Sequence, residues 1–463
     1  MKLWSISLRN LRIRAVATVL TTTSILVATA LYAAILVMAE QTEQRYKGSV
    51  GGFQAVIGPK DASQLELVLN TIFNVGEAPA LFPLQVAIDV RSGKASRRGQ
   101  IVYAIPQARG DSVSSHAFPV VATIDEMFTK FQLHGEALQF GAGRGFSFSW
   151  QELLELAEGL AAHENGKRAD AATPPVRPRM RPEWMQCVIG ARVARTLHLG
   201  LGDVVVPVHG KLGAFDRHEH REAACEVVGI LAPTNSPLDT TIFLPLGVHL
   251  LIGGHEGGVF VTELVPGLNP DQAKKLPVNA GRIGLTAIVV DPKDHLGAQI
   301  LRNEFMSRPD AQVAKPQEVI PRFLQQIGTA TDALTIIAWL VLLVASVSIT
   351  VAIYNTMNER RREIAIMRSL GARRHQILTI IVGEAALLSL FGALCGVFVC
   401  HACELLLRNL VEDMTGVYLD WLQFGLWELW LVLGVTGIGA LAGLLPAVKG
   451  SMTQVADNLA QNY

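Results

Sequence analysis

Charged side chains are scarce in this sequence of 463 residues. They make up 17% of the residues, against about 25% in typical soluble domains, whereas 50% of the residues are hydrophobic and the mean hydropathy is +0.33. This composition excludes a disordered or fibrous chain. Because 40 Lys and Arg residues balance 40 Asp and Glu residues, the chain also lacks the basic excess that would hold nucleic acid.

The sequence also lacks the short motifs of nucleotide and hydrolase chemistry. It contains no G-x-x-x-x-G-K-[ST] phosphate loop, no G-x-S-x-G nucleophile turn and no H-E-x-x-H zinc pair. We therefore predict no catalytic residue, no enzymatic activity and no cofactor bound by this chain. Any work that the protein performs then takes its energy from a partner.

The missing charge is concentrated in four long apolar runs, at residues 16–39, 333–355, 377–403 and 426–448. The first run has 24 residues without a charge, and a helix of that length, at about 1.5 Å per residue, exceeds the ~30 Å hydrocarbon thickness of a membrane. The predicted fold is an α-helical membrane protein with four transmembrane helices in a 1+3 layout. A large mixed α/β domain, residues 40–332, lies between helices 1 and 2.

Basic residues predict the orientation of these spans. Residues 1–15 carry Lys and Arg but no acid, and residues 356–376 carry six arginines, so both segments are expected in the cytoplasm. The tail at residues 449–463 is then cytoplasmic as well, whereas the loop at 404–425 and the large domain lie outside. A cleaved signal peptide is the alternative for the first span, but the apolar run is longer than a ~7–15-residue signal core.

The outer domain shows short strand patterns alternating with helical ones. A subdomain is expected at about 185–245, the Pro- and Arg-rich stretch at 165–182 predicts a linker, and the role of the insertion at about 132–183 stays open. Strands are expected at residues 51–57, 84–90, 119–123, 203–209, 224–231 and 284–291, and helices at 64–73, 124–131, 150–163, 187–199 and 316–328.

Two histidines in the outer domain give a weak metal hypothesis. His218 and His220 flank Glu219, and Asp216 lies close by, a combination that can bind zinc or copper. A closed site needs three or four ligands, and His209 is the only other histidine near in sequence. A solvated loop is the favoured interpretation.

The five cysteines leave alternatives open. Cys187 and Cys225 lie in the outer domain, where they form either a disulfide or two buried free thiols. Cys400 and Cys403 have a C-x-x-C spacing inside a span, where helix packing is favoured over a redox or metal pair.

The inner loop between the second and third spans predicts a short amphipathic helix. Ile364, Met367 and Leu370 recur at helical spacing with arginines around the rest, and Gly371 is the expected helix stop. An Arg-rich inner loop occurs in many membrane proteins, so this pattern alone leaves partner docking as one of two interpretations.

The same loop resembles a known family. Residues 359–372 (ERRREIAIMRSLGA) are similar to the R-x-x-E-I-x-x-(L/M)-R-x-x-G-A signature of the FtsX/MacB family of ABC transporter permeases, whose layout also matches. Glu384 and the glycines after it resemble the family's third span, residues 443–447 (GLLPA) its last, and residues 189–245 a MacB-type periplasmic core domain. Residues 132–183 match least.

The resemblance implies a function. Such permeases pair as homodimers or related heterodimers in the bacterial inner membrane, and each chain docks a separate cytoplasmic ATPase that holds ATP and Mg. A periplasmic binding or adaptor protein and membrane lipid are further implied partners. The function expected is mechanotransmission for export, lipoprotein release or metal-linked transport; the alternative is a membrane-anchored regulator of a periplasmic partner such as a cell-wall hydrolase. The expected docking residues are Glu359, Arg360, Arg361, Arg362, Glu363, Ile364, Met367, Arg368, Gly371 and Ala372, with Ile364 and Met367 in an apolar groove of the ATPase.

Small and charged residues within the spans carry further expectations. Gly392 with Gly396, and Gly439 with Gly443, form G-x-x-x-G pairs that permit close helix approach, and dimer packing through them stays open. Glu384 lies about two turns into the third span, where an isolated charge costs at least ~2.5 kcal/mol. We expect it to face protein in a structural hydrogen bond rather than to relay protons.

Overall fold

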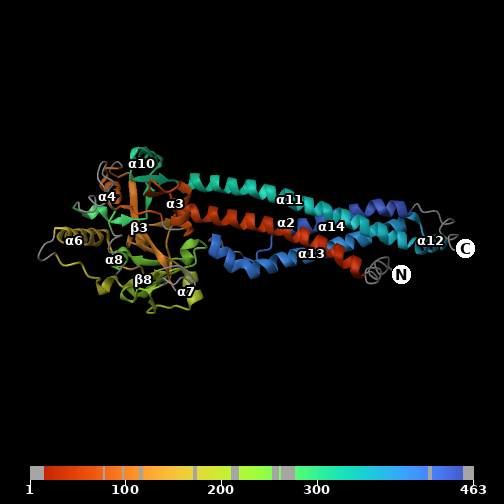
Figure 1. The fold of residues 1–463 in the computed structure, drawn as a ribbon, viewed down its shortest axis with the longest axis horizontal. Coiled ribbons are helices and arrows are strands. Elements are labelled where there is room, and N and C mark those ends of the chain that lie inside the picture. Colours follow the sequence, from red (N-terminus) through yellow and green to blue (C-terminus); the bar gives the residue numbers. More distant parts are fainter. Residues whose placement is uncertain are drawn as a thin grey trace. The chain divides into compact units, whose positions relative to one another are not determined.

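The computed structural model describes residues 15–76, 79–95, 99–113, 118–169, 175–209, 218–252, 260–261, 277–415 and 420–451. The chain divides into a helical unit, residues 1–43, 325–412 and 417–463, and an α/β unit, residues 44–324 and 413–416. Two of the four boundaries, at residues 43/44 and 324/325, fall inside helices α2 (Ala15–Ser49) and α11 (Pro316–Glu359) (Figure 1).

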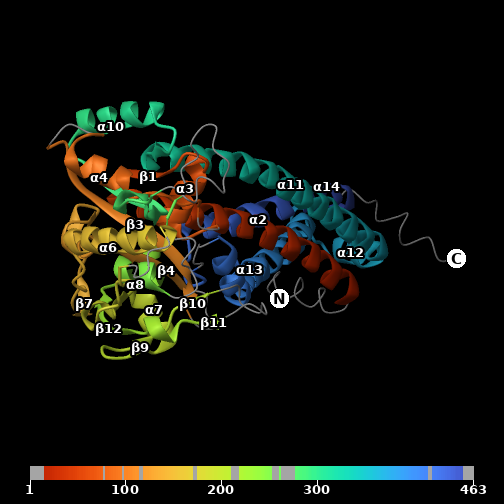
Figure 2. The same cartoon turned by 60° about the vertical axis from the view of Figure 1, so that its left-hand side comes forward.

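The α/β unit is built on a mixed ten-stranded sheet (Figure 2). The strand order is β16-β1-β15-β3-β4-β13-β8-β12-β7, and β9 pairs with β12 beside this path. Pairing is parallel between β4 and β13 and between β8 and β12, and antiparallel elsewhere. The strands are β1 (Ala55–Pro59), β3 (Ile101–Val113), β4 (Phe118–Thr123), β7 (Phe140–Gly143), β8 (Gln186–Ile189), β9 (Val204–Val205), β12 (Cys225–Leu231), β13 (Ile242–Pro245), β15 (Ala287–Pro292) and β16 (Ala311–Ala314).

Smaller elements complete the unit. Three two-stranded sheets pair β10 (Val208–His209) with β11 (His218–Glu219), β14 (Gly284–Leu285) with β2 (Phe82–Pro83), and β5 (Gln132–Leu133) with β6 (Glu136–Ala137). The helices are α3 (Gln64–Phe73), α4 (Gln85–Ser92), α5 (Glu126–Thr129), α6 (Trp150–Arg168), α7 (Ala191–Leu197), α8 (Leu246–Leu251) and α10 (His295–Ser307).

Local sequence explains where two of these helices begin. Ser63 and Glu66 form a capping box at the start of α3, and Ser149 with Glu152 forms another at the start of α6. In each box the serine hydroxyl accepts from the glutamate's backbone N–H, while the carboxylate accepts from the serine's N–H, so backbone donors at the helix start are satisfied. The helices expected at 64–73 and 150–163 are thereby confirmed, although α6 continues into the predicted linker.

Other expectations for this unit are wrong. The strand predicted at 84–90 is helix α4, because its buried residues Leu84, Ala87 and Val90 recur at helical spacing and Gly93 ends the helix in the left-handed region. The helix predicted at 187–199 is strand β8 followed by α7. Gly190 separates the two elements, where a Cβ atom would collide with the backbone carbonyls of the chain near Asp239.

A partly buried ion cluster links helix α4 to helix α5. Arg91 donates two hydrogen bonds, of 2.7 and 2.8 Å, to the carboxylate of Glu126, and the Lys130 ammonium lies 2.9 Å from it. Burial alone raises the pKa of Glu126, but these two cations outweigh it and hold the pKa below its usual value. Arg91 also stacks over the Trp150 ring at 4.3 Å, which ties α6 to the cluster.

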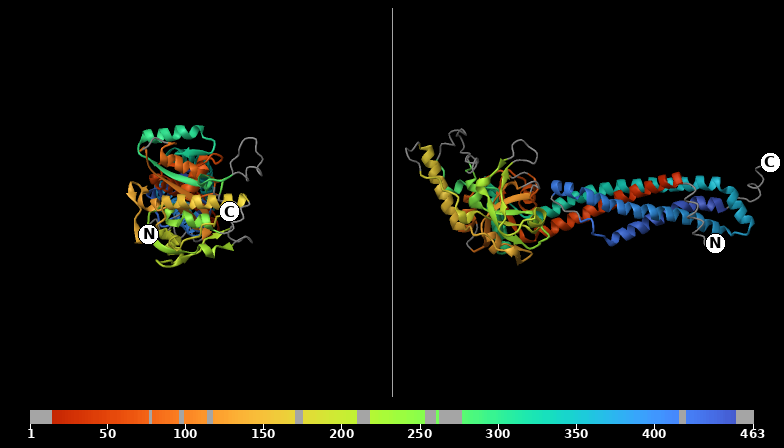
Figure 3. Two further views of the ribbon diagram at one scale, coloured as in Figure 1. Left: turned by 90° about the vertical axis from the view of Figure 1, so that its left-hand side faces the viewer. Right: turned by 90° about the horizontal axis from the view of Figure 1, so that it is seen from below.

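Among the residues of the helical unit that the structure describes, four helices are long and apolar enough to cross a membrane. Figure 3 shows these long helices from two further sides. They are α2, α11, α13 (Arg374–Thr415) and α14 (Leu426–Ser451), and α12 (Arg361–Ser369) is a short helix between α11 and α13. Large apolar side chains stay exposed along them, such as Phe398, Leu406 and Trp430. Contiguous exposure of this kind is typical of a surface that meets lipid or a partner.

These helices extend beyond the apolar runs. α2 continues ten residues past residue 39, and α11 begins 17 residues before residue 333 and continues through Pro321. The polar residues directly beside each apolar run, 40–49 and 322–332, contain no proline that would end the helix there. The helix expected at 316–328 is thus the first part of α11. Apolar runs predict the bilayer-crossing part of a helix, whereas helix ends depend on caps.

Both glycine pairs lie in contacts within the chain. A Cβ atom on Gly392 would lie 2.8 Å from Ile25 of α2, and one on Gly396 would lie 2.7 Å from Thr29, so α13 and α2 approach closely there. Gly439 of α14 faces Ser389 of α13 in the same way, and Gly443 lies against α13 one turn further on. The small residues let the helix backbones approach within a single subunit.

Candidate partner-docking site

The link between α11 and α13 is short and ordered by its own sequence. Only Arg360 separates the end of α11 from α12, and its backbone conformation (φ −102°, ψ 14°) turns the chain. At the other end Gly371 has φ +98°, and the Ala372 N–H donates to the Met367 carbonyl at 3.0 Å. The predicted helix stop at Gly371 is confirmed, because a left-handed residue ends the helix at little cost when it is glycine.

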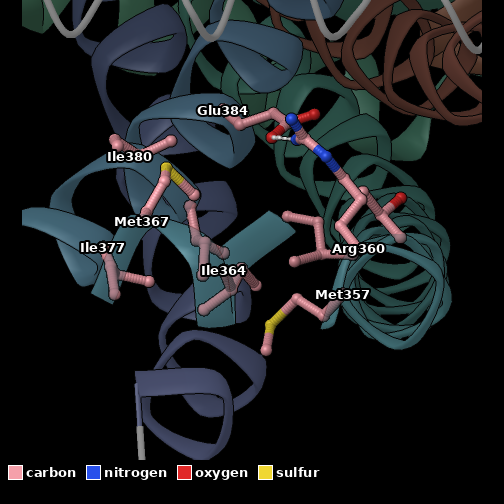
Figure 4. A pocket seen from close by; sticks show the side chains of 10 residues that line it. Met357, Arg360, Ile364, Met367, Ile377, Ile380 and Glu384 are labelled. Carbon is pink, nitrogen blue, oxygen red and sulfur yellow. Dashed lines mark ion pairs between the residues drawn. The ribbon is translucent and has the colours of Figure 1, made fainter. Parts of the chain in front are cut away.

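Helix α12 has one face inside the helical unit. The side chains of Ile364 and Ala365 are 6% and 4% exposed, and Ile364 belongs to the main apolar core of the helical unit, against which Met367 packs. A small cavity of about 30 Å³ lies beneath this face, large enough for about one water molecule. Its lining is Ile353, Thr356, Met357, Arg360, Ile364, Met367, Ile377, Ile380, Ile381 and Glu384 (Figure 4).

A charged pair closes the polar side of this cavity. The Arg360 guanidinium lies 3.8 Å from the Glu384 carboxylate on α13 (Figure 4). It also lies 2.9 Å from the Glu363 carboxylate on α12. The side chains of Arg360 and Glu384 are only 20% and 11% exposed. Arg360 therefore offsets the cost of burying Glu384 and ties α12 to the third apolar helix.

The other face of α12 is open. Arg362 and Glu363 are exposed, and two large apolar side chains, Ile366 and Leu370, are 43% and 83% exposed. We call these four residues the open face of α12. Two further arginines, Arg373 and the first residue of α13, Arg374, are exposed close to it in the sequence. The open face together with these two arginines combines apolar side chains with an excess of basic ones.

The structure distributes the predicted docking residues over both faces. Ile364, expected in a groove of a partner, lies in the chain's own core, and Met367, expected there as well, packs against that core. Arg360 is engaged with Glu363 and Glu384. The physical reason is that the apolar stripe of α12 first covers the apolar ends of the chain's own helices. Exposed or half-buried are Glu359, Arg362, Glu363, Arg368, Gly371 and Ala372, whereas the Arg361 side chain lies outside the described residues.

Sequence reasoning missed two residues of the open face. The helical spacing predicts Leu370 on the same side as Ile364 and Met367 and gives no role to Ile366. An ideal helix advances about 600° over six residues, so Leu370 would lie about 120° away from Ile364, at the edge of the apolar stripe. Because α12 also ends at Ser369, the Leu370 side chain leaves the stripe.

The next candidate residues are the two histidines of the metal hypothesis and the charged residues beside them. The His220 side chain is buried with Nδ1 3.0 Å from the Glu222 carboxylate, Glu219 pairs with Arg221 at 3.2 Å, and the His218 side chain lies outside the described residues. Among the residues that the structure describes, no group of three His, Cys, Asp or Glu side chains has the arrangement of a metal site. The zinc hypothesis gains no support from them.

Cys187 and Cys225 are free thiols on neighbouring strands. Cys187 Sγ lies 3.8 Å from the Cys225 carbonyl oxygen, and both side chains are fully buried. Burial raises the pKa of Cys225 to about 12 and that of Cys187 well above its usual value. Both groups therefore stay protonated and unreactive at neutral pH.

The four apolar helices and the short helix between two of them define a membrane protein with a large mixed α/β domain between the first and the later helices. Residues 335–454, which include α12, match the FtsX-like permease C-terminal family. Together with the relatives described next, this match supports an FtsX/MacB-like permease.

Three relatives are named as ABC transporter components. An uncharacterized ABC transporter permease of Methanocaldococcus jannaschii is 26% identical over 203 residues, which cover 42% of this chain and 49% of the relative. The uncharacterized ABC transporter permease YknZ of Bacillus subtilis is 30% identical over 33% of this chain and 37% of its own length. The macrolide export ATP-binding/permease protein MacB of Neisseria meningitidis is 31% identical over 135 residues, which cover 29% of this chain and 20% of MacB. The chain thus spans about half or less of these relatives.

Proposed function

We propose that this chain is the membrane subunit of an ABC transporter of the FtsX/MacB type and that it docks a separate cytoplasmic ATPase through the open face of α12. The observation that carries the proposal is the division of α12 into two faces. Its inner face is fixed in the core of the helical unit, while Ile366 and Leu370 remain exposed beside basic side chains. An exposed apolar pair with a charged rim is typical of a docking surface.

The sequence supports a separate ATPase. MacB, by its name, combines ATP binding with a permease, whereas this sequence has no phosphate loop. The segment that carries α12 is also the most basic loop of the chain, which favours the cytoplasm under the positive-inside rule. ATP and Mg then belong to the partner, and the large domain lies on the far side of a bacterial inner membrane.

Coupling requires that a push on α12 reach the membrane helices. Arg360 connects α12 with Glu384 of α13, and Ile364 packs into the core that α11, α13 and α14 share. We propose that closure of the ATPases moves α12 and that these contacts move α11 and α13 with it. The large domain would follow in a mechanotransmission cycle for export, lipoprotein release or metal-linked transport, in a homodimer or a related heterodimer.

Copurification tests the docking role. The full-length chain, tagged and extracted in mild detergent, is expected to recover a P-loop ATPase that hydrolyses ATP in the eluate. Arg362→Glu should reduce recovery at least tenfold, because reversing a charge at an interface replaces attraction with repulsion. Arg195→Glu, at an exposed arginine of α7 in the α/β unit, is the matched control and should leave recovery unchanged.

The proposal fails if no ATPase accompanies the wild-type chain. It fails equally if an ATPase is recovered to the same extent with Arg362→Glu and with a double substitution at Ile366 and Leu370. A drop in recovery with Arg195→Glu as large as that with Arg362→Glu would show a general charge effect rather than docking through α12.

A further inference from the structure

A buried histidine lies between two buried carboxylates in the helical unit. His401 Nδ1 is 3.3 Å from Glu404 Oε2, and His401 Nε2 is 3.2 Å from Glu428 Oε2. His401 and Glu404 lie on α13 and Glu428 in the first turn of α14, and all three side chains are more than nine-tenths buried. We call His401, Glu404 and Glu428 the triad.

The surroundings of the triad are mostly apolar or neutral. The Phe424 ring lies 4.4 Å from the His401 ring, centre to centre, and the Cys400 thiol donates to Glu404 Oε1 at 3.4 Å. The Gly425 N–H donates to Glu428 Oε1 at 3.1 Å. On α2 the Glu40 carboxylate accepts a hydrogen bond of 2.8 Å from the Trp427 indole.

Both carboxylates pair with His401, and among the described residues neither pairs with a lysine or an arginine. On α13 the other titratable groups nearby are the thiols of Cys400 and Cys403 and, one turn after Glu404, the side chain of Arg408. Two carboxylates in an apolar helix bundle are costly unless a proton or a cation accompanies them.

The hydrogen-bonding groups of the triad lack one proton when the imidazole of His401 is neutral. A neutral imidazole has one N–H and one lone pair, so one of the two carboxylates would face a lone pair. His401 Nε2 is hydrogen-bonded to Glu428 Oε2, whereas His401 Nδ1 and Glu404 Oε2 are both buried without a hydrogen-bond partner although they lie 3.3 Å apart. A proton on Nδ1 together with a small rotation of the Glu404 side chain gives each atom its partner, and the imidazolium then donates to both carboxylates.

The geometry favours a proton over a metal ion. The two carboxylates face opposite nitrogens of one ring, so a single ion bound at either nitrogen could reach only one of them. The described residues accordingly contain no group arranged to hold a metal. A proton on each ring nitrogen, by contrast, meets one carboxylate on each side.

We propose that the triad is a proton-binding site in which an imidazolium at His401 links α13 to the start of α14. The bound proton leaves the triad with one net negative charge instead of two. The link is complete while the proton is bound and is broken when rising pH removes it, because a lone pair then faces Glu404. The protein thus carries a pH-sensitive contact between two of its apolar helices, independent of the docking role of α12.

Amide substitutions test the site because they replace the mobile proton with a fixed donor. In Glu404→Gln the amide N–H can donate to His401 Nδ1, so a neutral imidazole can still donate through Nε2 to Glu428. In Glu428→Gln the amide N–H can donate to His401 Nε2, and a neutral imidazole can donate through Nδ1 to Glu404. We expect the thermal midpoint of the wild-type chain in lipid nanodiscs to fall as the pH rises from 6 to 9. Both amide variants should lose most of that fall, whereas Asp332→Asn, an exposed carboxyl of α11, should keep it.

A spectroscopic measurement tests the same site without relying on a variant's stability. With the histidines labelled with nitrogen-15, the wild-type chain at pH 6 should show both His401 nitrogens bonded to hydrogen, and one of them should lose its hydrogen at higher pH. The resonance is assigned as the one that shifts in Glu404→Gln or in Glu428→Gln. A His401 nitrogen that carries a lone pair at pH 6, or a fall in the thermal midpoint that both amide variants retain, would overturn the proposal.

Discussion

Leu370 offers the sharpest test of the open face of α12. Its side chain is 83% exposed, directly after the last helical residue. Burying a whole leucine side chain stabilises a complex by about 1.5–3 kcal/mol, so full burial against a partner accounts for about 1.2–2.5 kcal/mol. Leu370→Ser should therefore weaken the affinity for the ATPase by about 8- to 70-fold.

The assay is a titration of the purified ATPase onto the chain in nanodiscs by a surface-bound or fluorescence method. Leu406→Ser is the matched control, because Leu406 is also a leucine with 80% exposure but lies far along α13. The affinity of the Leu406→Ser variant for the ATPase should stay within about twofold of the wild-type value. An unchanged affinity in Leu370→Ser, or an equal loss in both variants, would refute docking through the open face.

Three further predictions follow from named contacts. Gly396→Ala should lower the thermal midpoint in nanodiscs, because the new Cβ meets Thr29 of α2, whereas Gly437→Ala, which has open space around it, should not; equal effects would contradict close packing of α13 on α2. Arg360→Met should keep ATPase binding but lower the ATP hydrolysis that depends on the membrane subunit, because the link to Glu384 is lost; a loss of binding instead would make Arg360 a docking residue. Glu126→Gln should destabilise the protein at neutral pH by about 1–3 kcal/mol, since it leaves the partly buried guanidinium of Arg91 without its carboxylate. The folded pKa of Glu126 is lowered, so its contribution is present above the unfolded pKa of about 4.3 and is lost as the pH falls through the lower folded value. Denaturation curves of variant and wild type should therefore converge as the pH falls below the unfolded pKa; a constant gap would contradict the ion cluster.

The sequence predicts the four apolar helices well because a bilayer demands long uncharged runs, and no tertiary contact is needed to recognise them. It predicts α3 and α6 well because their capping boxes are local. Strand β8 and helix α4 are different cases. Short apolar runs such as these fit either element, and only pairing with distant strands, or packing on them, decides between the two.

The docking site on α12 could be predicted only in part, because some of its features are local in the sequence and others depend on distant contacts. Amphipathicity shows that α12 has an apolar face, and Gly371 shows where it ends. What the apolar face contacts is decided by the ends of α11 and α13, which approach it only in the folded chain. The sequence therefore could not show that Ile364 is internal while Leu370 is exposed, nor that His401 lies between Glu404 and Glu428.

The central claim is that a separate ATPase contacts the open face of α12, and site-specific photo-cross-linking in cells tests it most directly. A photoreactive residue at position 366 or 370 is expected to cross-link to a P-loop ATPase, whereas one at buried position 364 should cross-link only within the chain. The account is contradicted if positions 366 and 370 capture no ATPase while the chain is present at its normal level in the membrane.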